Sequence, residues 1–403
     1  MTCDTDDPYK ININLDNDKD NKRKEFFEKG LAALLADDHF LLLYVPDNGD
    51  KMQVIRPASD SYHRKRMIKR INEAKILPSF YYALSHMWGL SDDNRHLWNE
   101  IGDYVDDEQG KPMEPVSMRS EKRNTLLSML KDHPDSYWWI DVLCARTDTP
   151  LVIMGDIYAC CLECVAMIDC GPSVIPEINA IMDTVDSERW TYEHLSSMDY
   201  ATLLNQLSTL MQSKWWKRVW TWQEMALPLG DIRFMAETGT HRPESNTITM
   251  KKLLKIQELV RLIRSMPGGF GELEPAAKVY SSIYLEILHA RHCRINRMTG
   301  RSAHGLVSLI RSLGDSPRQC MDPVDHVYGV LGMLQIKIPR MSDPKAIWQC
   351  FLTELDDCLK EIIERRFIDH VQDFDLTKAK TIGDVYSVLW SHLSNSVIDD
   401  IQF

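Results

Sequence analysis

The chain has 403 residues, of which 44% are hydrophobic and 26% are charged. These proportions exclude general disorder, and the length predicts one sizeable core with a second domain or a long helical extension. The net charge of −12 argues against nucleic acid or an anionic membrane surface as the main partner, since both require a basic field on the protein.

Hydropathy and cysteine usage predict the compartment. No apolar run approaches the roughly 20 residues needed to span a bilayer, and residues 1–27 are largely polar where a secretory signal is apolar. Ten cysteines occur, mostly in apolar stretches such as YACCLECVAMIDCG (158–171). Although Cys161 and Cys164 form a C-x-x-C pair, no second pair or histidine cluster stands at zinc-ligand spacing. We therefore predict a cytoplasmic protein without a membrane span, whose cysteines pack in the core and bind no metal.

The N-terminal region, 1–79, is predicted to be an arm followed by a short helix and strand. Residues 1–22 are rich in Asp, Asn and Lys, whereas 23–45 shows helical spacing and then an apolar run. The basic stretch 62–75 has the pattern of a helix with a solvated face.

Three nearly continuous apolar runs predict the centre of a sheet. Such runs are typical of strands that are covered on both faces. Helix-like stretches separate them, which implies right-handed crossovers and a parallel α/β sheet. The strands are expected at 80–86, 137–143 and 164–169, and the helices between them at 119–132 and 153–162.

After residue 171 the pattern becomes mainly helical. Helices are expected at 199–213 and 214–227, a further strand at 231–237, and mostly helices from 249 to 403. The predicted organisation is thus an α/β domain over 80–237, preceded by 1–79 and followed by a helical region over 249–403.

Polar groups at the predicted strand ends are the first candidates for a site, because ligands of open parallel sheets bind at the carboxyl ends of the strands. Each also has a purely structural interpretation, as a turn former, a cap or a plug over the sheet. The residues are Ser85, His86, Trp88 and Gly89 after the first strand, Asp141, Cys144 and Arg146 after the second, and Asp169 and Gly171 after the third.

The most distinctive carboxylate is Glu224, within SKWWKRVWTWQEMAL (213–227). On a continuous helix Trp216, Trp220 and Glu224 would share one face. A carboxylate among indoles is partly desolvated, which raises its pKa unless a cation pairs with it. Glu224 is therefore either the partner of Arg218 in a structural ion pair or a catalytic carboxylate, with the tryptophans as stacking surfaces for an aromatic ligand.

Other catalytic motifs are missing from the sequence. No G-x-S-x-G elbow, P-loop, dinucleotide-binding glycine pattern or H-E-x-x-H helix occurs. Aspartate pairs do occur and could hold magnesium against a diphosphate; Asp92-Asp93, just past Gly89, is the best placed of them.

Four blocks of the sequence, in order, resemble the fungal heterokaryon-incompatibility (HET) domain family. They are YYALSHMWG (81–89), YWWIDVLC (137–144) with MGDIYACC (154–161), WWKRVWTWQEMAL (215–227), and DPVDHVYGVLGML (322–334), which resembles a segment common downstream in such proteins. One departure is the loop CARTDTPLVIMGDIY (144–158), which is shorter than the family's and lacks its Asn-Gln pair.

This resemblance implies a TIR-like fold and a function in non-self recognition. HET proteins are implicated in programmed death of incompatible fused fungal cells, and some TIR domains cleave the nicotinamide–ribose bond of NAD with a helical glutamate. Glu224 looks like that glutamate, Ser85–Gly89 like the end of the first TIR strand, and Asp141 and Arg146 lie near the loop after the second. NAD would then be a substrate, with no cofactor, and Trp88, Trp216 or Trp220 would stack on its rings.

Three functions remain open from the sequence. The first is a cell-death effector that cleaves NAD after self-association. The second is a non-catalytic assembly module whose helical C-terminal region binds an unknown protein partner. The third is a HET scaffold recruited as a metabolic enzyme, with the altered loop and Asp92-Asp93 as its signs.

Overall fold

The computed structural model describes residues 7–15, 21–88, 96–184, 199–242, 245–265, 270–299, 303–316, 318–364 and 375–392. The chain forms two compact units, each described by itself. The first unit comprises Met1–Thr149, Cys160–Trp216 and Pro228–Tyr284, and the second comprises Pro150–Ala159, Lys217–Leu227 and Leu285–Phe403.

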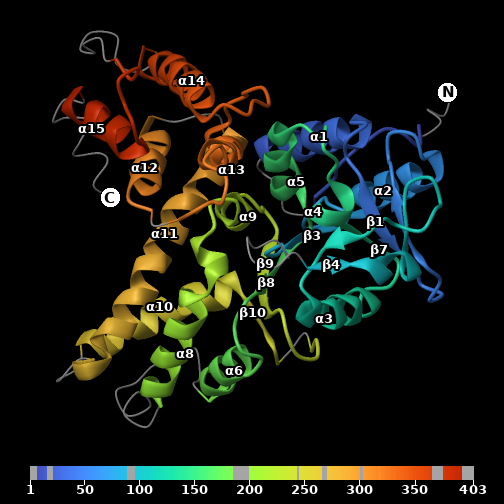
Figure 1. The fold of residues 1–403 in the computed structure, drawn as a ribbon, viewed down its shortest axis with the longest axis horizontal. Helices are drawn as coiled ribbons and strands as arrows, with labels where there is room; N and C mark the ends of the chain where they lie inside the picture. Colours follow the sequence, from blue (N-terminus) through green and yellow to red (C-terminus); the bar gives the residue numbers. More distant parts are fainter. Residues whose placement is uncertain are drawn as a thin grey trace. The chain divides into compact units, whose positions relative to one another are not determined.

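The first unit is built on an eight-stranded, mostly parallel sheet (Figure 1). Its strand order is β10-β9-β8-β3-β7-β1-β2-β5, and the central strands β9, β8, β3 and β7 are parallel to one another. The strands are β1 (Leu42–Val45), β2 (Met52–Ile55), β3 (Tyr81–Ser85), β5 (Val105–Asp106), β7 (Ser136–Ile140), β8 (Glu163–Ile168), β9 (Asp231–Ala236) and β10 (Thr247–Thr249), while β4 (Leu97–Trp98) and β6 (Val116–Ser117) form a separate antiparallel pair.

The expected central strands are confirmed, and burial explains why they form. Every residue of β7 is buried, and β3 and β8 are nearly as buried, which is the pattern of strands covered on both faces. The second strand ends earlier than expected, at Ile140, because Asp141 begins the short helix α4 (Asp141–Cys144). Segment 1–79 contributes β1 and β2 to the same sheet, with β1 antiparallel to β7.

Helices flank this sheet, and in Figure 1 α1 and α3 lie on opposite sides of it. The expected helices at 62–75, 119–132 and 199–213 are confirmed as α2, α3 and α8. The helices of the first unit are α1 (Asn21–Ala36), α2 (Ser61–Glu73), α3 (Ser120–Lys131), α4, α6 (Val174–Asp183), α8 (Tyr200–Gln212) and α10 (Met250–Ser265), with short 3-10 turns η1 (Asn99–Asp103) and η4 (Gly271–Leu273).

The described part of the second unit is helical. Its elements are η2 (Leu151–Ile153), α5 (Met154–Cys160), α9 (Thr221–Ala226), α12 (Ala303–Gly314), α13 (Asp325–Leu334), α14 (Pro344–Glu364) and α15 (Ile382–His392), and α11 (Glu274–Thr299) runs into it from the first unit. A helical C-terminal region was the expectation, and it is confirmed.

One helix prediction is wrong: 214–227 is not continuous. A 3-10 turn, η3 (Lys214–Lys217), is followed by a break and then by α9. The break occurs because the backbone at 217–219 pairs with Gln319 instead of continuing the helix. The Val219 N–H donates to the Gln319 carbonyl at 3.0 Å, and the Gln319 N–H donates to the Lys217 carbonyl at 2.5 Å. Trp216, Trp220 and Glu224 therefore do not share one face of a single helix.

Candidate functional site

The carboxyl ends of four parallel strands place polar side chains on one edge of the sheet. Because β7, β3, β8 and β9 run in the same direction, the residues that follow them lie along the same edge. They are Ser85 and His86 after β3, Asp141 after β7, Asp169 after β8 and Glu237 after β9. The predicted juxtaposition of the first two strand ends is confirmed.

His86 is the centre of a buried polar cluster at this edge. Its side chain is 0% exposed, and its Nε2 atom lies 2.9 Å from Asp141 Oδ1. On the other side of the ring, Lys122 Nζ lies 2.8 Å from His86 Nδ1 and also donates a hydrogen bond to the Met87 carbonyl. Lys122 comes from α3 and is itself fully buried. A lysine, a histidine and an aspartate from three elements thus meet in one desolvated place.

The electrostatics of this cluster keep His86 neutral. Burial lowers the pKa of His86 most, the adjacent charge of Lys122 lowers it further, and Asp141 opposes both effects. The Nδ1 atom of His86 lies 2.8 Å from the Lys122 ammonium, which can only donate, and 3.1 Å from the Met87 carbonyl, which can only accept. His86 is therefore a neutral imidazole with polar groups beside both ring nitrogens, and it is poorly suited to be a general base.

Trp88 connects the buried cluster to solvent. Its indole Nε1 donates a hydrogen bond to Asp141 Oδ2, and the residue is 39% exposed. Asp141, held by the backbone N–H of Val142 at 2.7 Å as well, fixes the orientation of this ring. An oriented, part-exposed indole is a suitable stacking surface for an aromatic ligand. Gly89 and the pair Asp92-Asp93 lie outside the described residues.

Ser85 and Trp216 are integrated into the core. The Ser85 hydroxyl accepts a 2.8 Å hydrogen bond from Trp215 Nε1, and the residue is 1% exposed. Trp216 is also 1% exposed, and its ring packs against Trp215 and Phe234 at centroid distances of 4.8 and 5.2 Å. Through Trp215 and Phe234, both residues are part of the packing of the sheet.

Arg146 lies just after α4 and is anchored from several sides. Its Nη2 donates to Glu108 Oε2 at 2.6 Å, and its Nη1 donates to the Leu143 and Ala145 carbonyls at 2.7 and 3.1 Å. The side chain keeps 29% of its surface exposed, so it is the part-solvated cation among the predicted site residues of the first unit.

Glu224 and Trp220 belong to the second unit. Glu224 lies in the middle of α9 and is 6% exposed. Trp220 immediately precedes α9 and hydrogen-bonds to Asp325, the first residue of α13. Burial raises the pKa of Asp325, and the bond from Trp220 partly counteracts this. The third and fourth sequence blocks are therefore in contact, whereas the meeting of Glu224 with the strand ends of the first unit stays a prediction.

Two groups at the strand ends were missed by sequence reasoning. Glu237 follows β9, is 4% exposed and forms an ion pair with Arg119. Lys122 lies in the helix expected over 119–132, in which no residue was selected as a site candidate. The burial of Lys122 could have been predicted, because helical spacing places it on the same face as the apolar residues Leu126 and Met129, and this face is buried.

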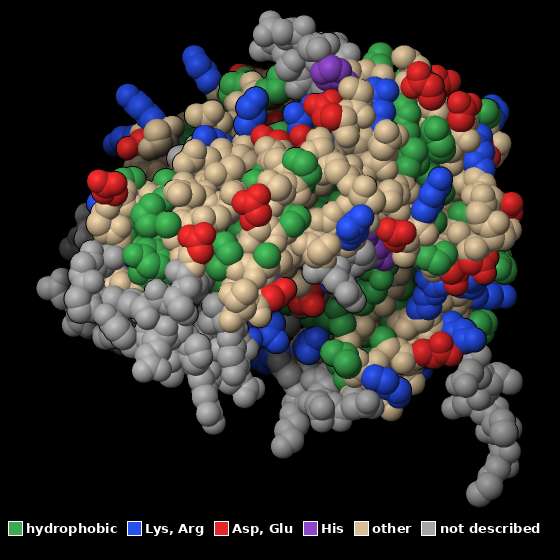
Figure 2. All heavy atoms as spheres, turned by 90° about the horizontal axis from the view of Figure 1, so that it is seen from below, with side chains coloured by type: hydrophobic (Ala, Val, Ile, Leu, Met, Phe, Trp, Pro, Cys, Tyr) green, Lys and Arg blue, Asp and Glu red, His purple; other side chains and the backbone are tan. Residues whose placement is uncertain are grey.

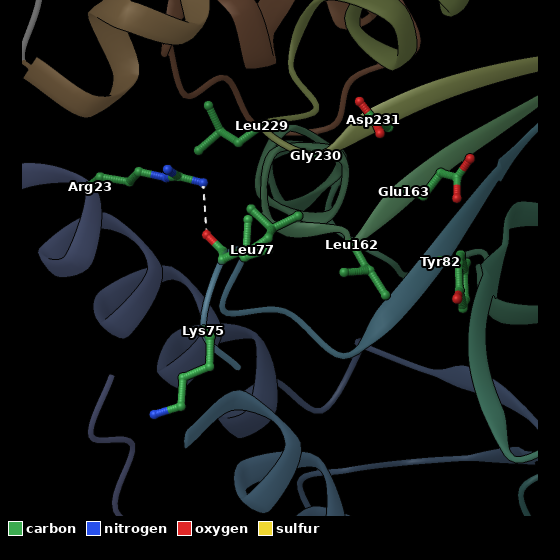
Figure 3. A pocket seen from close by; sticks show the side chains of 10 residues that line it. Arg23, Lys75, Leu77, Tyr82, Leu162, Glu163, Leu229, Gly230 and Asp231 are labelled. Atoms are coloured by element: carbon green, nitrogen blue, oxygen red, sulfur yellow. Dashed lines mark hydrogen bonds between the residues drawn. The ribbon is translucent and has the colours of Figure 1, made fainter. Parts of the chain in front are cut away.

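A surface cavity of about 560 Å³ lies away from these residues (Figure 3). Glu163 and Asp231, which line it, begin β8 and β9, so it opens at the amino ends of the strands. Arg23 closes one side through a 3.3 Å hydrogen bond to the Ile76 carbonyl. Parallel sheets carry their sites at the opposite edge, and we do not assign the chemistry to this cavity.

Surface and metal features add little to the site. Figure 2 shows basic and acidic side chains interspersed over the face turned to the viewer. Among the described residues no helix is long and apolar enough to cross a membrane, and no group of three or more His, Cys, Asp or Glu side chains could hold a metal ion.

Comparison with known proteins identifies the family of the central segment. No curated protein and no solved structure matches the chain. Residues 81–224 match the family model described as heterokaryon incompatibility protein (HET). The match begins with β3 and ends at Glu224, so it covers His86, Asp141 and most of α9. Residues 81–224 are therefore a heterokaryon incompatibility (HET) domain.

Proposed function

We propose that this protein acts in fungal non-self recognition and programmed cell death, and that its HET domain cleaves the nicotinamide–ribose bond of NAD after self-association. The observation that carries the proposal is the burial of Glu224, the last residue of the matched segment, in a short helix. Carboxylates that folding removes from water are concentrated at functional sites and in structural ion pairs, and we assign Glu224 to the first group.

The proposed chemistry needs few groups. Cleavage of the nicotinamide–ribose bond develops positive charge on the ribose, so a fixed carboxylate that orients a ribose hydroxyl and faces this charge lowers the barrier. Glu224 would provide the carboxylate. Trp88 would stack on the nicotinamide or adenine ring, and Arg146 would offer its exposed guanidinium edge to the diphosphate. His86 and Asp141 would hold Trp88 in place, and a TIR-like fold of the HET domain is part of this proposal.

Purified protein tests the proposal directly. NAD consumption and nicotinamide release should be measured for the wild type, for Glu224→Gln and for the control Glu258→Gln, which changes an exposed glutamate of α10. We expect the wild type and the control to cleave NAD once concentrated or crowded into assemblies, and Glu224→Gln to lose about 100-fold or more. Equal activity in all three proteins, or no cleavage in any assembled state, would refute NAD cleavage.

A second candidate is a non-catalytic assembly module, and one observation favours it. The predicted ligand-binding groups Ser85, His86 and Arg146 each have intramolecular partners. In that case self-association would be insensitive to Glu224→Gln, the helical C-terminal region would bind a protein partner, and no NAD would be consumed. Sedimentation of wild type and Glu224→Gln, with and without NAD, separates the two functions.

A further inference from the structure

Arg318 is a buried arginine in the same unit as α9. Its side chain is 1% exposed, although its three-carbon stem would normally carry the charge to the surface. Glu286 of α11 neutralises it: Arg318 Nε donates a hydrogen bond to Glu286 Oε1, and the Glu286 side chain is 10% exposed. A buried ion pair of this kind is costly to desolvate, so its retention calls for a role.

The Nη1 group of Arg318 donates to the start of α9. Its Nη1 donates to the Arg218 carbonyl at 2.8 Å and to Thr221 Oγ1 at 2.7 Å. The guanidinium carbon lies 5.2 Å from the centre of the Trp222 ring, in the geometry of a cation–π contact. One side chain thus contacts the first residue of the break and the first two residues of α9.

The backbone beside Arg318 holds the same segment. Gln319 pairs with the backbone on either side of Arg218, through the two hydrogen bonds that end the 3-10 turn. Together, 318–319 fix both the main chain and the side chains that lead into α9. Because α9 has only six residues, it is too short to be stable by itself, and its position depends on these contacts.

We propose that Arg318 is a positioning residue for Glu224. Thr221 and Glu224 are three residues apart on α9 and lie on the same side of the helix, so a clamp on Thr221 sets the turn that carries the carboxylate. The inference rests on the proposed function for its catalytic meaning. It adds that the helical region outside the matched segment is needed to place the carboxylate.

Hydrogen exchange tests the clamp without requiring activity. The full chain carrying Arg318→Met should exchange the amides of 217–227 roughly tenfold or more faster than the wild type, with little change in the strands of the first unit. The matched control is Arg311→Met, which changes an exposed arginine of α12 in the same unit. Unchanged exchange in 217–227 for Arg318→Met would overturn the proposal whether or not the protein cleaves NAD.

A milder variant guards against simple unfolding of the second unit. Thr221→Val keeps the volume of the side chain and removes the hydroxyl, which accepts a hydrogen bond from Arg318 Nη1 and donates one to the Arg218 carbonyl. It should speed exchange in 217–227 by a smaller factor while α14 stays protected. Equal protection of 217–227 in Thr221→Val and wild type would also contradict the clamp.

Kinetics test the link to Glu224. A misplaced carboxylate lowers kcat more than it raises KM, and a displacement of about 1 Å can cost up to about 100-fold. We expect kcat to fall at least tenfold in Arg318→Met with KM within about twofold, and to recover partly in Arg318→Lys, which keeps the charge opposite Glu286 but not the planar fork. Faster exchange with unchanged kcat would show a structural clamp and refute positioning. If the wild type is inactive, the proposed function fails, and exchange alone decides whether the clamp exists.

Discussion

The two units each bury a basic side chain, and they use it differently. Lys122 in the first unit contacts a neutral histidine beside Asp141. Arg318 in the second unit contacts Glu286 and the start of α9. Lysine is a compact point charge that shifts the pKa of its neighbours, whereas arginine is a planar fork that holds several groups in fixed directions. The comparison indicates that the first cluster sets a protonation state and the second sets a position.

The largest expected effect comes from Lys122→Met. The change leaves the Met87 carbonyl without its lysine donor and removes the positive charge beside His86 Nδ1. Removing one member of a buried charged network costs more than the network contributes. We expect the first unit to lose about 2–3 kcal/mol of its free energy of unfolding in urea titrations.

Lys131→Met is the matched control for that variant. Lys131 is exposed at the end of the same helix, so its removal should change the free energy of unfolding by less than about 0.5 kcal/mol. If Lys122→Met were as stable as the control, the cost of desolvating the ammonium would equal or exceed the gain from its contacts. The claim that Lys122 stabilises the cluster around His86 would then be wrong.

A smaller effect is expected from Gly332→Ala in the second unit. A Cβ at Gly332 would meet Gln223 Oε1 at 2.4 Å and the Cα of Gly155 at 2.8 Å. The amide can rotate away, but the Gly155 backbone must move, so we expect a loss of about 1–2 kcal/mol after the helix-propensity gain of alanine is included. Hydrogen exchange should show it in α13 and α9 and not in β3 or β8.

Gly171→Ala controls for the loss of glycine freedom. A Cβ there would meet only Val174 Cγ2, at 3.8 Å, which is ordinary van der Waals contact, and stability should change little. If both substitutions changed the free energy of unfolding equally, the close approach of Gly332 to Gln223 and Gly155 would not be what holds α9 in place.

Sequence reasoning predicted the first unit better than the second, for a physical reason. The ends of β3 and β7 meet because parallel strands share an edge, and hydrophobic runs reveal such strands; His86 and Asp141 followed from this rule. No periodicity in the sequence pairs residues 217–221 with 318–319, because that contact depends on how helices pack. The continuous helix expected over 214–227 was wrong for the same reason: a distant backbone competed for its hydrogen bonds.

The protonation state of His86 gives a pH test of the first unit. Its pKa is lowered from the ordinary 6.5, so below pH 6.5 the unfolded chain binds the proton more readily than the folded chain. The contribution of His86 to the free energy of unfolding is therefore complete above pH 6.5. It decreases as the pH falls, by at most about 1.4 kcal/mol per pH unit. His86→Gln should flatten the curve between about pH 6.5 and 5. The pKa of His63 is also lowered, but His63 is present in both proteins, so its effect cancels when the two stability curves are subtracted. If the free energies of unfolding of wild type and His86→Gln had the same pH dependence, a neutral His86 would be contradicted.

The smallest effect on stability is expected at Arg146, whose side chain is partly exposed. Arg146 shares its guanidinium between two carbonyls and Glu108. Burial raises the pKa of Glu108, but hydrogen bonding and charge from Arg146 outweigh it, so the net pKa is lowered. Because the pair is partly solvated, Glu108→Gln should lower the free energy of unfolding by only about 0.5 kcal/mol.

The same variant tests the proposed contact of Arg146 with NAD. The Glu108 carboxylate competes with a substrate diphosphate for Arg146, so Glu108→Gln should lower the KM for NAD about twofold. A stability loss with unchanged KM would assign Arg146 to the fold, beside Lys122 and Arg318, and leave the diphosphate without this cation.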